Sequence, residues 1–196
     1  MRIWTSKLAP VSISLFALAV IGLAAPAAVA QTYKVDPVHS FINFKINHLG
    51  VSNAWGRFDG PTGTVTIDQN DPSKSNIHIE AKTDKVNTGV EKRDAHLKSP
   101  DFFNAKQFPT LAFQSKSVKK SGDNALEVIG DLTLHGVTKP ITVTVTKVGE
   151  ADTQMGPRAG WETNFTVKRS DFGMSGMVGP VGDDVQVWVN LEAVKQ

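Results

Sequence analysis

Residues 125–148, ALEVIGDLTLHGVTKPITVTVTKV, contain two runs in which apolar and polar residues alternate. Leu126, Val128 and Leu132 share one face of the first run, and Val143 and Val145 share one face of the second. A period of two is typical of a half-buried strand, because successive side chains of a strand point to opposite faces. Between the runs, a glycine and a proline supply the chemistry of a tight connection. The stretch therefore predicts an antiparallel hairpin with one apolar face.

The same alternation returns along most of the chain. It recurs in HSFINFKINH (39–48), GTVTID (63–68), NIHIEAKT (76–83), TLAFQSKSV (110–118), GWETNFTVK (160–168) and DVQVWVNLEA (184–193). About eight strands with one apolar face each must cover those faces, either as two packed sheets or as a closed barrel. A barrel of about eight strands has no free edges and can hold one small ligand. The periodicity predicts an all-β antiparallel domain and leaves the choice between sandwich and barrel open.

One segment, residues 88–106, interrupts the strand pattern. Its first part, residues 88–97, is rich in helix formers. At Ser99 a capping residue is followed by a proline and an acid, which predicts the start of a second short helix that contains Phe102 and Phe103. We expect a short helical insertion between two strands that carries aromatic side chains.

The first thirty residues have the pattern of a secretory signal peptide. Arg2 and Lys7 precede an apolar run, and a small-residue cleavage pattern ends at Ala30. The apolar run is shorter than the roughly 20 residues that a spanning helix needs. We therefore expect residues 1–30 to be cleaved and residues 31–196 to form one domain in the periplasm.

Composition excludes several classes of function for the mature chain. Removing residues 1–30 leaves 196 − 30 = 166 residues with 19 Lys and Arg against 19 Asp and Glu. A chain without excess positive charge offers little to neutralise phosphates, so no nucleic-acid binding is expected. The absence of cysteine excludes disulfides, thiol catalysis and thiolate metal sites.

The sequence contains no familiar spacing of catalytic or metal-binding residues. The five histidines form neither HxxxH nor HExxH, and no GxSxG occurs. We therefore expect no metal and no catalytic residue. Asp94 and His96, two positions apart, are the pair on which an alternative acid–base enzyme, a hydrolase or isomerase, would depend.

Several longer stretches, in order and spacing, resemble the YceI-like family of periplasmic lipid- or polyisoprenoid-binding proteins. They are DPVHSFINFKINHLG (36–50), WGRFDG (55–60), RDAHLKSPDFFNAKQFPTLAF (93–113), LTLHGVTKP (132–140) and RSDFGM (169–174). Phe108 and Ala112 depart from the family pattern, in which tyrosine and threonine are expected. The resemblance implies a lipocalin-like eight-stranded antiparallel β-barrel whose apolar lumen holds one long amphiphile, such as a polyisoprenoid or an isoprenoid quinone, and no cofactor. The insertion would then cap the barrel.

On this interpretation, apolar residues that face inward would contact the lipid tail. The expected set is Ile42, Phe44, Ile46, Phe58, Phe102, Phe103, Phe113, Val128, Leu132, Val143, Phe165 and Val187. Polar residues at the mouth would contact the head group or brace the cap. The expected set is Arg93, Asp94, His96, Arg169 and Asp171.

A third interpretation makes the protein an interaction module that delivers quinone to a membrane redox partner. Such a module would expose an apolar patch at its rim. Transient contact with inner-membrane proteins and a homodimer are further partner hypotheses.

Overall fold

The computed structural model describes residues 1 and 30–196, and most of this part is β-strand. The strands are β1 (Gln31–Val35), β2 (Phe41–His48), β3 (Ser52–Phe58), β4 (Thr62–Ile67), β5 (Asn76–Lys82), β6 (Val86–Asn87), β7 (Thr110–Lys120), β8 (Ala125–Leu134), β9 (Val137–Thr153), β10 (Gly156–Lys168) and β11 (Val181–Lys195). The helical elements are α1 (Glu91–Leu97) and the 3-10 turns η1 (Pro72–Lys74), η2 (Thr83–Lys85) and η3 (Arg169–Phe172). Residues 2–29 of the predicted signal peptide lie outside the described residues. No helix in the described ranges has the length and hydropathy needed to cross a membrane.

Eight strands close into an antiparallel barrel. Going round the wall, the order is β1, β4, β5, β7, β8, β9, β10 and β11, and β1 pairs with β11 to close the ring. The long strand β11 pairs with β1 through residues 193–195 and with β2 between Val181 and Asn190. Strand β3 then pairs with β2, and β6 pairs with β3. The predicted all-β antiparallel fold is therefore confirmed, and the open choice is resolved in favour of the barrel.

Three strands were not predicted from the alternation. In β3, the sequence SNAWGRF places only Phe58 in the buried class, so its pattern lacks a continuous apolar face. Strand β1 has only five residues, and β6 has only two. Strands this short carry too few residues for a periodicity to stand out.

The insertion contains one helix, not two. Helix α1 forms within the predicted residues 88–97. After it, the amides of Phe103 and Ala105 donate to the carbonyls of Leu97 and Lys98 at 2.9 and 3.0 Å, spacings of six and seven residues. Such long-spaced bonds fold residues 97–105 into compact turns in place of the i→i−4 ladder of a helix. The predicted second helix at Ser99 is wrong, although the Ser99 hydroxyl does accept from the Asp101 amide at 3.3 Å.

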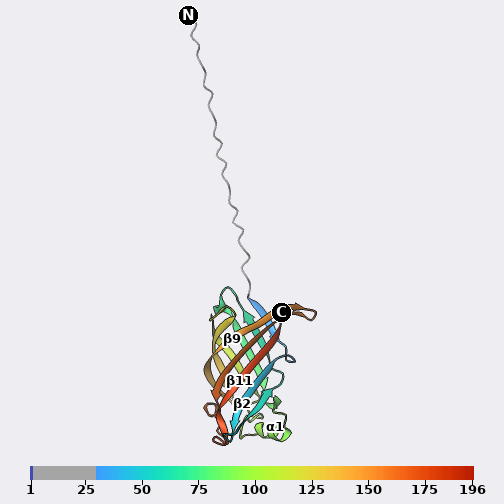
Figure 1. Ribbon diagram of the computed structural model, residues 1–196, viewed down its shortest axis with the longest axis vertical. Coiled ribbons are helices and arrows are strands. Elements are labelled where there is room, and N and C mark those ends of the chain that lie inside the picture. The colour runs from blue at the N-terminus through green and yellow to red at the C-terminus, as the bar shows by residue number, and fades with distance from the viewer. Residues whose placement is uncertain (2–29) are drawn as a thin grey trace.

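The two ends of the barrel differ in how they are filled. At the end that holds the C-terminus, the rings of Tyr33 and Trp161 pack edge to face at 5.1 Å, and Val118 and Val128 are fully buried. At the opposite end lie α1, the turns that follow it and the glycine-rich loop 173–180 (Figure 1). We call these the closed end and the mouth.

Candidate functional site

The barrel encloses an apolar cavity, the lumen, of about 190 Å³. The inward faces of strands from all round the wall line it, as the alternation requires. Eleven of the twelve residues expected at the lipid tail border it: Ile42, Phe44, Ile46, Phe58, Phe102, Phe103, Phe113, Leu132, Val143, Phe165 and Val187. Val128 does not. It is fully buried against its neighbours in the wall, paired with Val118 and Val143.

Two aromatic rings of the lumen wall lie over glycines of neighbouring strands. The Phe44 ring covers Gly56 on the neighbouring strand, and the Phe113 ring covers Gly130. A Cβ at either glycine would collide with the ring. The glycines therefore keep both rings out of the middle of the lumen, which leaves room for a ligand.

Few polar side chains interrupt this apolar lining. Thr163 borders the lumen, and its buried hydroxyl has no protein hydrogen-bond partner. Arg169 borders the lumen at the mouth. A buried hydroxyl without a partner is unfavourable, so a ligand oxygen that reached Thr163 would relieve that cost.

Arg169 is buried and holds the loop of the mouth together. Its Nε donates to the carbonyl of Gly182 at 2.8 Å, and its Nη2 donates to Val181 at 3.0 Å. Its Nη1 donates to the carbonyls of Met174 and Gly176 at 2.8 and 2.6 Å. Burial lowers the pKa of this guanidinium, since it is removed from water. With its donors occupied by main-chain carbonyls, Arg169 acts as a brace for the loop.

Two phenylalanines of the insertion cover the lumen at the mouth. The Phe103 ring meets the Phe58 ring at 5.1 Å and the Phe44 ring at 6.5 Å, both edge to face. The Phe102 ring lies 5.0 Å from the His96 ring and 5.9 Å from the Arg169 guanidinium. The insertion therefore places both rings on the lumen, as the cap interpretation expects.

A second cavity, the mouth groove, continues the lumen outward. It has a volume of about 320 Å³ and lies between the β2–β3 hairpin, α1 and the glycine-rich loop. It shares the side chains Phe44, Ile46, Leu97, Phe102 and Val181 with the lumen. Its remaining lining is largely polar or aromatic: His48, Ser52, Asn53, Ala54, Trp55, Thr88, Arg93, His96 and Met177. An amphiphile with its tail in the lumen would place its head here.

The residues expected at the head group divide between three places. Arg93 and His96 line the mouth groove, and Arg169 lines the lumen. Asp94 borders neither cavity, because its carboxylate accepts from the Thr88 amide and hydroxyl at 2.8 and 2.5 Å. Asp171 is exposed, 3.8 Å from the Lys139 ammonium, and also borders neither.

The pair required by the enzyme alternative is not assembled. Asp94 is bound to Thr88, whereas the His96 Nε2 lies 3.1 Å from a carboxylate oxygen of Asp101. General acid–base catalysis by a coupled pair requires the two groups within hydrogen-bond reach of each other or of one substrate atom. Here each side chain has a separate partner that stabilises the insertion.

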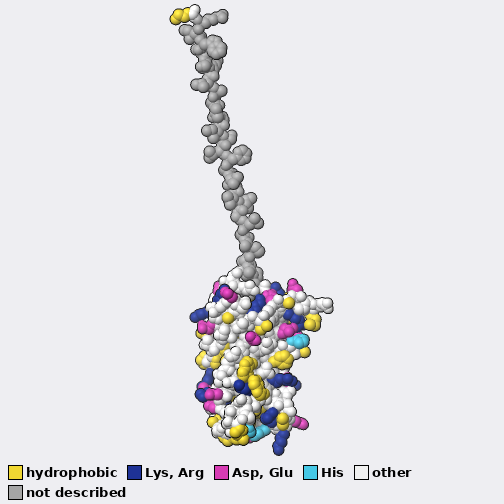
Figure 2. All heavy atoms as spheres, viewed as in Figure 1, with side chains coloured by type: hydrophobic (Ala, Val, Ile, Leu, Met, Phe, Trp, Pro, Cys, Tyr) yellow, Lys and Arg dark blue, Asp and Glu magenta, His cyan; other side chains and the backbone are white. Residues whose placement is uncertain are grey.

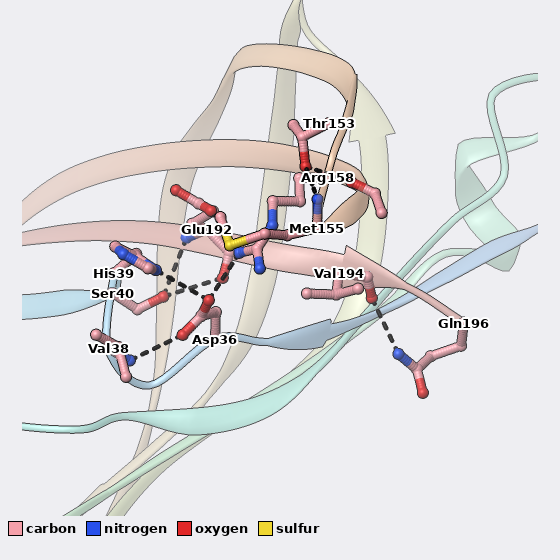
Figure 3. A network of polar contacts seen from close by, with 11 residues as sticks. Asp36, Val38, His39, Ser40, Thr153, Met155, Arg158, Glu192, Val194 and Gln196 are labelled. Carbon is pink, nitrogen blue, oxygen red and sulfur yellow. Dashed lines mark hydrogen bonds and ion pairs between the residues drawn. The ribbon is translucent and has the colours of Figure 1, made fainter.

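One cluster in the described part of the chain has the residue types of a metal site. Potential ligand atoms of Asp36, His39 and Glu192 lie within 4.8 Å of one another. However, the Arg158 Nη1 lies 2.7 Å from Asp36 and 2.6 Å from Glu192, so a guanidinium already occupies the position of the cation (Figure 3). Arg158, with help from His39, holds the pKa of the Asp36 carboxyl well below its usual range. The arrangement is an ion-pair network at the closed end.

Sequence reasoning missed part of both cavities. Leu134, Ile141, Val145, Trp161, Val185, Val189 and Leu191 line the lumen. They share the alternating faces already recognised, so the signal was present. The β3 side of the mouth groove, around Trp55, had no such signal, because β3 lacks a continuous apolar face and was therefore not predicted.

Comparison with known proteins gives concordant matches. The model of the YceI-like domain family matches residues 33–193. A protein YceI of Salmonella arizonae is 40% identical over 184 residues, which cover 92% of this chain and 96% of the relative. The solved structure of a Campylobacter jejuni YceI protein is 28% identical, with a TM-score of 0.67 over 76% of this chain and 89% of that chain. A polyisoprenoid binding domain from Saccharophagus degradans shares the fold at 17% identity, with a TM-score of 0.66 over 84% of this chain and 98% of that chain.

Proposed function

We propose that this chain, which belongs to the family of YceI-like domains, binds one long amphiphilic lipid in its barrel lumen and carries it in the periplasm. The observation that carries the proposal is the apolar lumen that opens into a more polar mouth groove. A wholly apolar compartment joined to one that also carries polar side chains matches a molecule with a tail and a head. The predicted signal peptide supports the location.

A polyisoprenoid or an isoprenoid quinone is the ligand class that we favour. Its branched hydrocarbon would lie against the aliphatic and aromatic wall, and its head would lie near Arg93 and His96. The solved polyisoprenoid binding domain with the same fold is consistent with this choice. Since each buried methylene contributes roughly 0.8 kcal/mol, the tail would supply most of the affinity. The protein would act by binding, without turnover.

A series of amphiphiles with one head group and increasing tail length tests this proposal on delipidated protein. Until the lumen is filled, each added methylene should tighten the dissociation constant roughly fourfold. Isothermal titration or displacement of an environment-sensitive fluorophore would measure the constants. A dissociation constant that does not change with tail length would contradict binding in the lumen.

A further inference from the structure

Four exposed apolar side chains surround the mouth. Leu49 and Val51 belong to the β2–β3 turn, and Met177 and Val178 belong to the glycine-rich loop. Their exposed fractions run from 46% to 83%. The Leu49 amide donates to the Pro180 carbonyl at 2.7 Å, which joins the two segments. We call these four residues the mouth rim.

Two of the rim residues have a backbone conformation that does not suit them. Leu49 has φ 56° and Met177 has φ 55°. Positive φ is unfavourable for residues with a Cβ, and hairpin turns that need it normally use Asn and Gly. Gly50, which follows Leu49 with φ 71°, fits this preference, whereas Leu49 does not. Exposed apolar side chains at strained positions bring no benefit to folding, so the rim points to a role in binding.

The mouth groove beside the rim has no carboxylate in its lining, although Asp101 lies next to it, with its main chain against Gly176 of the glycine-rich loop. The ionisable side chains that line the mouth groove are His48, Arg93 and His96, and no carboxylate lines it. Asp101, the partner of His96, lies outside the lining. Trp55 completes the groove, and indole rings and cations are the side chains that collect at lipid head groups. Figure 2 shows hydrophobic side chains beside Lys, Arg and His at the end that carries α1.

From these features we infer that the mouth rim docks on the surface of an anionic phospholipid bilayer. The four apolar side chains would enter the head-group region, and the groove lined by His48, Arg93 and His96 would face the phosphates. In this orientation the lumen opens onto the membrane, so a lipid tail could pass between bilayer and barrel without crossing water. The inference rests on the proposed lipid-carrier function, for which it supplies the route of loading.

Flotation of the mature protein with vesicles tests the inference. Vesicles of phosphatidylglycerol with phosphatidylethanolamine are compared with vesicles of phosphatidylcholine alone. The double variant Leu49→Asn with Val51→Ser should lower the partition onto the anionic vesicles by roughly tenfold or more. Neither residue lines the lumen or the mouth groove, and asparagine tolerates positive φ, so the melting temperature should not change.

A matched control removes apolar surface from the closed end. Val148 and Met155 are 62% and 65% exposed and lie on β9 and in the β9–β10 turn. The variant Val148→Ser with Met155→Asn should bind vesicles like the wild type. If the substituted turn lowers the melting temperature, Val51→Ser with Val178→Ser repeats the test with Leu49 intact.

Several results would overturn the inference. One is equal flotation of the rim variant and the wild type, and another is an equal loss of flotation in the closed-end control. A third is wild-type protein that shows no preference for anionic vesicles. A fourth is release of the protein from the vesicles by soluble glycerol phosphate at the same phosphate concentration. A change of oligomeric state in the rim variant without a change in flotation would assign the rim to a second copy of the chain. Flotation by wild-type protein that holds no lipid would support docking and contradict the proposed function. Failure of the docking inference can therefore be distinguished from failure of the proposed lipid-carrier function.

Discussion

The substitution Val143→Asp is expected to abolish lipid retention and to lower the free energy of unfolding by several kcal/mol. Val143 is buried and borders the lumen from β9. A carboxylate there would lose its hydration without gaining a partner, because its neighbours in the lumen are apolar. A carboxyl group that stayed neutral would still place a polar group against the lipid tail.

The neighbouring substitution Thr142→Asp provides the matched control. Thr142 is exposed on the outer face of the same strand and lies opposite Ile129. The substitution places the same new carboxylate in water, so lipid retention and the free energy of unfolding should both stay close to those of the wild type. Lipid extraction with mass spectrometry and urea denaturation measure the two properties. Equal lipid content in both variants would show that the lumen is not the binding site.

The double substitution Phe102→Ala with Phe103→Ala is expected to accelerate lipid release while the barrel keeps most of its stability. Both rings cover the lumen from the insertion, and Phe103 packs on Phe44 and Phe58. Truncating a phenylalanine of an ordinary core costs roughly 3–5 kcal/mol, and two such losses would approach the whole stability of a domain, about 5–15 kcal/mol. Truncating two rings of a cap that lies outside the barrel strands should cost less free energy of unfolding.

Phe108→Ala is the control for this experiment. Phe108 follows the insertion closely, between it and β7, but its ring packs on His135 and Gly136 and borders neither cavity. Its truncation removes an aromatic ring without uncovering the lumen, so the lipid dissociation rate should not change. The cap interpretation would fail if the double variant lost its cooperative unfolding transition, or if its lipid dissociation rate matched that of the wild type.

Much of the fold follows from one local signal. In β9, the run of Ile141, Val143 and Val145 against threonines determines which side chains face inward, and the same holds in β8, β10 and β11. Because the signal is local, it predicts strands and their inward faces. It does not tell which inward side chains border a cavity and which are packed among their neighbours, which is why Val128, on the inward face, is fully buried and does not border the lumen.

The polar part of the site was harder to predict, because its partners are distant in the chain or belong to the main chain. Arg169 binds carbonyls as far away as Gly182, and nothing in RSDFGM distinguishes a loop brace from a ligand for a head group. The Asp94 carboxylate accepts a hydrogen bond from Thr88, whereas Arg93, one residue earlier, lines the mouth groove. Neighbours in sequence thus have different roles, which only the packed structure separates.

Native mass spectrometry of the protein purified from its own cells tests whether the barrel lumen holds a lipid. We expect a mass increment of one amphiphilic lipid per chain, which organic extraction should release and fragmentation should identify as an isoprenoid or related long-chain molecule. Val143→Asp should lack this increment, and Thr142→Asp should retain it. Wild-type protein that is free of any bound lipid after purification without detergent, or that carries only a small water-soluble molecule, would contradict the account.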